Sequence, residues 1–172
     1  MKKRNLKKGV TLAEIVIVLA VVAVMSTMVI SFSVACNAWV RQGTARHTAL
    51  SSFNLVKGGI KAFADGFDSE KYVFDTDGIK LSVYEKNASE GEPAFYMEFK
   101  EGVLTGKSAE GDIAYPAENI TGVSFILLES PSGSLFLKFT VYYSVPPLND
   151  NRNPETGSYE VAAALRAAGK RQ

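Results

Sequence analysis

Glu14 is the residue whose type and position suggest chemistry, because it is a lone carboxylate at the start of a long apolar segment. It closes the stretch KKGVTLAE, residues 7–14, in which Lys7 and Lys8 precede Gly9. A carboxylate in apolar surroundings is unfavourable unless a cation pairs with it. The chemistry that Glu14 suggests is therefore ion pairing with a positively charged partner.

The other reactive side chains are too few to build a catalytic or metal site. The 172 residues include one histidine, His47, and one cysteine, Cys36, so the sequence excludes both a Cys/His metal cluster and an intrachain disulfide. It contains no phosphate-binding Walker loop, no nucleophile elbow and no His-Glu-x-x-His motif. We expect no enzymatic activity and no cofactor.

The apolar segment that follows Glu14 is long enough to cross a membrane. Residues 15–36 carry no charge, and as a helix they span roughly 33 Å, against about 30 Å for a hydrocarbon core. The first nine residues hold five basic side chains and no acid, so the chain from Val10 onward carries a formal charge of −4 against +1 for the whole. Because basic flanks stay in the cytoplasm, we expect the N-terminus inside and the bulk of the chain outside. An acidic exported part gives no electrostatic basis for direct nucleic-acid binding.

Two interpretations of this N-terminus follow from the residues alone. One is a cleaved signal peptide, in which Ser33, Val34 and Ala35 form a small-x-small pattern before Cys36, with a lipoprotein as a variant. The other is a single-pass anchor, in which Glu14 is a tolerated charge near the cytoplasmic edge of the bilayer. Either would make the chain a membrane-anchored or secreted extracellular binding domain. Neither interpretation explains why a carboxylate stands at position 14.

A third interpretation comes from a family resemblance. The residues that carry it are Lys8, Gly9, Val10, Thr11, Leu12 and Glu14. They resemble the signature of type IV prepilins, which is a basic leader ending in glycine, then an apolar residue, Thr, Leu, any residue and Glu, and then a long apolar helix. The match covers about the first 35 residues closely and the remainder only in architecture.

The resemblance implies a processing site and an assembly contact. A prepilin peptidase in the membrane would cut between Gly9 and Val10, where glycine leaves the backbone open to close approach. The same enzyme class usually N-methylates the new terminus, here Val10, although members more often carry phenylalanine at that position. The ammonium group exposed by cleavage would then pair with Glu14 of a neighbouring subunit, inside a bundle of apolar helices, and set the axial register of the filament.

Two acidic segments are similar to calcium sites. The segment from Asp75 to Gly78 resembles the start of a calcium loop, but its twelfth position is Lys86 where glutamate is needed, so we interpret it as a turn. Some pseudopilins bind calcium in a C-terminal loop, and the residues here with suitable oxygens are Asn149, Asp150, Asn151 and Glu155. A solvated loop is the favoured interpretation of that segment.

The fold expected from the patterns is α+β and pilin-like, with one long N-terminal helix packed on an antiparallel sheet. We expect the helix from about Val10 to about Ala64, with residues 10–36 in the membrane or filament core and 37–67 as its amphipathic continuation, weakened at Gly58-Gly59. Apolar residues at spacings of three and four predict one buried stripe. This stripe comprises Ala49, Phe53, Val56, Ile60, Phe63 and Phe67.

From residue 68 to 145 a period of two predicts the antiparallel sheet. The expected strands are 71–75, 79–85, 94–99, 120–130 and 134–145, with VLTG at 103–106 as a further candidate and turns at 75–78 and 131–133. Residues 146–157 are rich in Pro, Asn and Gly and predict a loop. The remaining tail has good helix formers and is expected to be a short helix or frayed.

The resemblance, together with these patterns, implies a non-enzymatic subunit of a type IV filament, either a minor pilin or a pseudopilin. After loss of the leader, residues 1–9, it would assemble with other pilin subunits from the cytoplasmic membrane into an extracellular or periplasmic filament. The sequence does not choose between a type IV pilus, a type II secretion system and a DNA-uptake machine.

Overall fold

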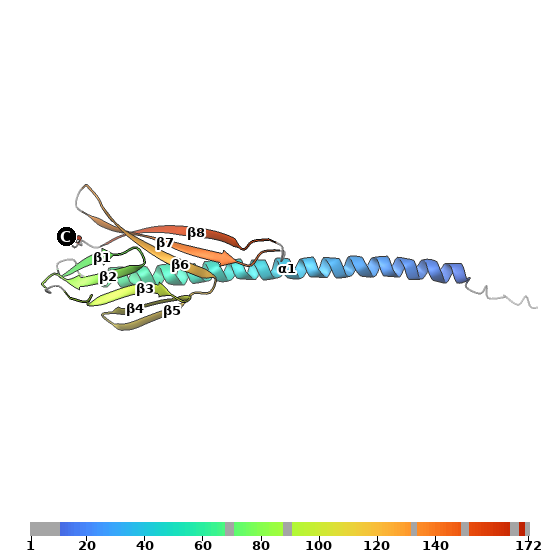
Figure 1. The fold of residues 1–172 in the computed structure, drawn as a ribbon, viewed down its shortest axis with the longest axis horizontal. Helices are drawn as coiled ribbons and strands as arrows, with labels where there is room; N and C mark the ends of the chain where they lie inside the picture. Colours follow the sequence, from blue (N-terminus) through green and yellow to red (C-terminus); the bar gives the residue numbers. More distant parts are fainter. Residues whose placement is uncertain are drawn as a thin grey trace, which may run out of the picture. The chain divides into compact units, whose positions relative to one another are not determined.

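The computed structural model describes residues 11–67, 71–87, 91–131, 134–148, 152–165 and 169–170. The chain divides into two compact units, an N-terminal unit, Met1–Arg41, and a C-terminal unit, Gln42–Gln172. The elements in chain order are α1 (Leu12–Asp65), β1 (Tyr72–Thr76), β2 (Lys80–Glu85), β3 (Phe95–Lys100), β4 (Val103–Ser108), β5 (Gly111–Pro116), β6 (Ile120–Glu129), β7 (Leu135–Val145), β8 (Glu155–Ala164) and β9 (Gly169–Lys170) (Figure 1).

The long helix expected from the sequence is confirmed. It runs for 54 residues, and Gly58 and Gly59 do not interrupt it. Its predicted first residue, Val10, lies outside the described residues. At its other end the Gly66 amide donates to the carbonyl oxygens of Ala62 and Phe63, which closes the last turn.

The predicted apolar stripe is the face that α1 buries. All six of its residues are buried, and Val56 and Ile60 are completely inaccessible. Five of the six belong to α1, and Phe67 follows two residues after the helix ends at Asp65. Gly59 lies on the same face, where an added Cβ would come within 2.7 Å of the Tyr115 ring. A helix glycine that looks like a weakness in sequence therefore lets the Tyr115 ring lie close against the helix backbone.

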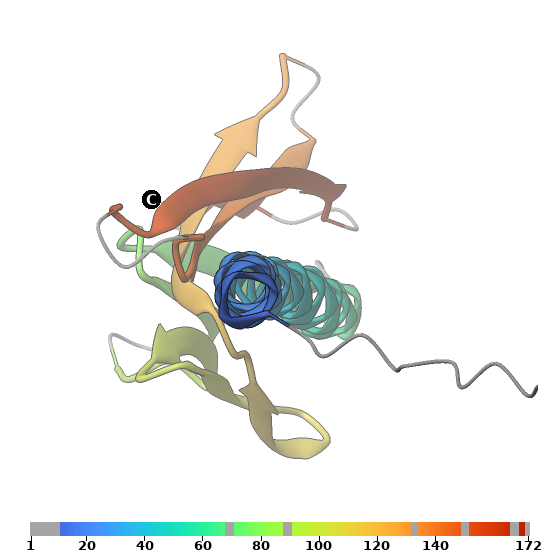
Figure 2. The same cartoon turned by 90° about the vertical axis from the view of Figure 1, so that its right-hand side faces the viewer.

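The strands form two sheets rather than the single sheet that was expected. One has the order β5-β4-β3-β2-β1-β9, in which β1 to β5 pair antiparallel and β9 pairs parallel with β1. The other is an antiparallel sheet with the order β6-β7-β8. Within the C-terminal unit, the two sheets lie on different sides of its segment of α1 (Figure 2).

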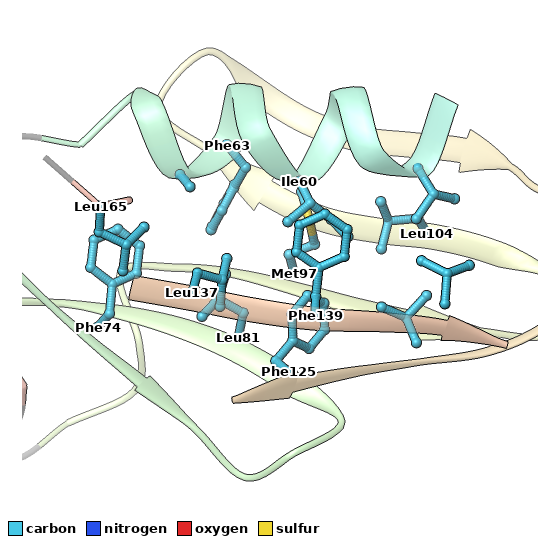
Figure 3. Close-up of a cluster of buried hydrophobic side chains, with 14 of the residues drawn as sticks. Ile60, Phe63, Phe74, Leu81, Met97, Leu104, Phe125, Leu137, Phe139 and Leu165 are labelled. Atoms are coloured by element: carbon cyan, nitrogen blue, oxygen red, sulfur yellow. The ribbon is translucent and has the colours of Figure 1, made fainter. Parts of the chain in front are cut away.

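One core joins helix and sheets. Ile60 and Phe63 of α1 meet side chains from both sheets, among them Met97 of β3 and Phe139 of β7 (Figure 3). β7 shows the expected alternation, since Leu135, Leu137, Phe139 and Val141 are buried while Tyr142 is exposed. Thr140 departs from it and is buried on the other face of the strand.

The β1–β2 connection confirms the interpretation of residues 75–78 as a turn. Gly78 has a φ of 95°, which favours glycine. The Asp77 carboxylate accepts hydrogen bonds from the amides of Lys80 (2.8 Å) and Ile79 (3.0 Å), and these bonds lower its pKa. The Asp77 carboxylate thus already accepts hydrogen bonds from the backbone amides that close the turn.

The prediction for the C-terminal tail was wrong. Residues 155–164 form β8, which pairs with β7 over ten consecutive positions from Val145↔Glu155 to Phe136↔Ala164. Residues 146–172 are therefore more than a loop and a tail, and the loop expected at 146–157 ends before Glu155. Tyr159 and Val161 pack on the core, and this tertiary packing overrides the helix preference of the alanines.

Candidate functional site

The N-terminal unit presents an apolar helix surface that nothing in the described chain covers. Every residue of α1 from Leu12 to Ala35 is exposed. The large apolar side chains include Leu12, Ile15, Val16, Ile17, Val18, Leu19, Val21, Val22, Val24, Met25, Met28, Val29, Ile30, Phe32, Val34, Trp39 and Val40. A soluble monomer rarely leaves an apolar surface of this size bare. Large exposed apolar surfaces of this kind generally mark interaction sites.

Two hydroxyl groups within this apolar segment donate hydrogen bonds to carbonyls of the helix itself. Ser26 Oγ donates to the Val22 carbonyl at 2.8 Å, and Thr27 Oγ1 donates to the Val24 carbonyl at 2.7 Å. Without such bonds a hydroxyl in hydrocarbon would lack a partner, at a cost of several kcal/mol. These two hydroxyl groups are therefore suited to apolar surroundings.

Glu14 is the charged residue of the segment, with no other Asp, Glu, Lys or Arg from residue 12 to 40. Its Oε2 accepts a hydrogen bond from the Thr11 amide at 2.8 Å and another from Thr11 Oγ1 at 3.0 Å. In return the Glu14 amide donates to Thr11 Oγ1 at 3.3 Å. This reciprocal pattern is a capping box, and it fixes the first turn of α1.

The capping role of Thr11 was missed in the sequence, although the signal was present. Thr-x-x-Glu ahead of an apolar run is the sequence pattern of a capping box. The box holds the Glu14 carboxylate at the helix N-terminus, where the helix dipole favours a negative charge. Lys7, Lys8, Gly9 and Val10 lie outside the described residues, so the predicted cleavage site stays a prediction.

Replacing Thr11 tests the capping box. We expect Thr11→Ala to lose both side-chain bonds of the hydroxyl, and Thr11→Ser to keep them. Loss of an N-cap typically costs helices about 1 kcal/mol. Amide hydrogen exchange of residues 12–15, in detergent micelles, should be several-fold faster in Thr11→Ala and close to wild type in Thr11→Ser. Equal rates in the two variants would show that the box does not hold this turn.

The C-terminal unit gives no metal-binding arrangement among the described residues. No group of three or more His, Cys, Asp or Glu side chains gathers in that part of the chain. Asn149, Asp150 and Asn151 lie outside it, and Glu155 contacts Arg46 and Gln42. His47 is exposed on α1, as expected for a solvent-facing residue.

By length and composition α1 is able to cross a membrane. Its strongly apolar window lies near the N-terminus, and none of that window is buried inside the structure. A core helix of a soluble protein would be mostly buried, whereas a membrane span, a helix of a bundle and an N-terminal signal sequence all leave such a window exposed in the single chain. Comparisons with protein-family models, with curated proteins and with solved structures found no significant match to this chain.

Proposed function

We propose that this chain is a non-enzymatic subunit of a type IV filament system, either a minor pilin or a pseudopilin. The observation that carries the proposal is the position of Glu14. It is a lone carboxylate, held in a capping box at the start of a helix whose next turns expose apolar side chains on every side. The capping box would serve a plain membrane anchor as well, but only a helix bundle that must register its subunits also uses the charge of this acid.

In the proposed mechanism the subunit first inserts in the cytoplasmic membrane with its N-terminus inside. A prepilin peptidase removes residues 1–9 and leaves an ammonium group on Val10, which the same enzyme methylates. The subunit then leaves the bilayer for the filament, where its apolar helix packs among those of other subunits. The C-terminal unit forms the filament surface.

Glu14 supplies the specificity of this step. In a bundle of apolar helices an unpaired carboxylate is strongly disfavoured. A neighbour displaced along the axis by the wrong distance would leave both its own ammonium and this acid without a counter-charge. Pairing between the two charges therefore selects one axial offset between subunits, while the apolar contacts supply most of the attraction.

The N-terminal residue of the mature protein tests the proposal against the rival of an anchored or secreted binding domain. The full chain is expressed in bacteria that have an active prepilin peptidase and in a strain that lacks it, and the intact mass is measured from the membrane fraction. A chain that begins at Val10 only where the peptidase is active supports the filament subunit. A chain that begins at Cys36 supports a secreted domain or lipoprotein, and an uncut Met1 in both strains supports a simple anchor.

A further inference from the structure

Two turns of α1 at the start of the C-terminal unit are attached in a different way from the rest of its helix. No side chain from residue 42 to 48 of α1 is buried, and the buried face begins at Ala49. The apolar stripe therefore does not hold these turns. Polar contacts join them to strands that lie far away in the sequence.

Glu155, the first residue of β8, makes two of these contacts. Its Oε2 accepts from Arg46 Nη2 at 2.5 Å and from Gln42 Nε2 at 3.4 Å. Gln42 and Arg46 are four residues apart, so both lie on one face of the helix, and a single carboxylate reaches both. The hydrogen bond and the charge of Glu155 raise the pKa of Arg46 above its ordinary value.

A third contact comes from the segment between β5 and β6. Asn119, which has a positive φ of 62°, donates from Nδ2 to the carbonyl oxygen of Ala45 at 3.2 Å. Near these polar contacts, the Tyr159 ring of β8 packs between two other rings. Its centroid lies 4.6 Å from that of Phe53 in α1 and 5.1 Å from that of Tyr143 in β7. This aromatic stack fixes where β8 meets the helix, and Glu155 extends the attachment by two turns.

We propose that Glu155 is an ionic latch, which holds residues 42–48 of α1 on β8 and releases them when salt or loss of charge weakens the pair. The Arg46 and Glu155 side chains are 56% and 41% exposed. An exposed ion pair is weak and is screened at high ionic strength. A contact of this kind opens easily, and the buried residues from Ala49 onward keep the remainder of the unit folded while it opens.

The test is hydrogen exchange on the full chain in detergent micelles, followed on peptides that cover residues 42–50 and 53–65. Glu155→Gln removes the charge and keeps the shape. The matched control is Glu160→Gln, which breaks the other ion pair of β8, between Lys138 and Glu160 at 2.9 Å. We expect exchange at 42–50 to be roughly two- to fivefold faster in Glu155→Gln, the range that exposed pairs produce, and unchanged in Glu160→Gln.

Salt and charge reversal complete the test. In 1 M salt, where charges are screened within about 3 Å, the wild type should exchange at 42–50 as fast as Glu155→Gln does. The double variant Arg46→Glu with Glu155→Arg should restore slow exchange at low salt. Equal exchange at 42–50 in the two single variants, or faster exchange across 53–65 as well, would overturn the latch. Because the measurement uses the unassembled subunit, its outcome is independent of the filament proposal.

Discussion

Glu14→Ala is expected to leave the subunit in the membrane, processed and folded, and to remove it from filaments. Alanine is a better helix former than glutamate and is compatible with apolar surroundings, so insertion should not suffer. The ammonium of a neighbouring subunit would then enter the bundle without its counter-charge, and an unpaired buried charge costs several kcal/mol. Immunoblots of sheared filaments and of membranes, from cells that express the full machinery, should show at least a tenfold loss from the filament fraction only.

Two companion variants identify the cause of that loss. Glu14→Asp keeps the charge on a shorter side chain and should retain part of the incorporation, whereas Glu14→Gln keeps the length without the charge and should behave as alanine does. Ala13→Gln places a polar side chain next to Glu14 in the same turn and controls for polarity alone. Normal incorporation of Glu14→Gln would show that entry into the filament does not depend on an ion pair at Glu14.

Gly106→Ala is expected to be the most destabilising single-methyl change in the C-terminal unit. Gly106 is buried in β4, opposite Met97 of β3, and a Cβ there would lie 2.3 Å from the carbonyl oxygen of Tyr96. Because that atom belongs to the backbone of the neighbouring strand, the clash is relieved only if the strands move apart. Overpacking of this kind costs about 2–3 kcal/mol.

The measurement is thermal unfolding of the full chain in micelles, followed by the near-ultraviolet signal of its tyrosines. For a unit of this size the melting temperature should fall by roughly 5–15 °C. Gly58→Ala is the control, because a Cβ at Gly58 meets no atom within 4 Å and the position is helical. It should raise the stability by up to about 1 kcal/mol. An unchanged melting temperature for Gly106→Ala would show that the strands accommodate the methyl group.

Periodicity predicted most of the fold. The stripe from Ala49 to Phe63 has an unbroken helical spacing, and the structure buries all of it, because a single continuous helix must direct such a stripe to one side. The hairpin between β1 and β2 was equally readable, since Asp77-Gly78 requires a turn. Where local preference and tertiary packing agree, the sequence alone is sufficient to predict the element.

β8 was missed because its local preference and its packing disagree. β8 carries Gly157 and a run of alanines, which are poor strand formers. It is held by its pairing with β7 and by the close approach of Tyr143, whose hydroxyl lies 2.4 Å from the position that a Cβ of Gly157 would take. Such cross-strand partners are distant in sequence, and no local window contains them. The same holds for the contact of Glu155 with Arg46, 109 residues apart.

The sequence analysis singled out Glu14 but did not predict the hydrogen bonds that the structure gives it. The position of Glu14 in the apolar run is visible in the sequence. Its carboxylate was expected to be paired only by the terminal ammonium of another subunit. The structure gives it a partner in its own chain, Thr11. Assembly would then exchange or extend these hydrogen bonds rather than rescue an isolated charge.

The central claim is an ion pair between the Val10 ammonium of one subunit and Glu14 of another, and a lipophilic carbodiimide tests it most directly by converting a touching pair into an amide bond. Filaments are assembled from an equal mixture of ¹⁴N- and ¹⁵N-labelled subunits, treated, digested and analysed by mass spectrometry. The account predicts a peptide in which Val10 of one isotope is joined to Glu14 of the other. Crosslinks confined to a single isotope, or subunits that still begin at Met1, would contradict it.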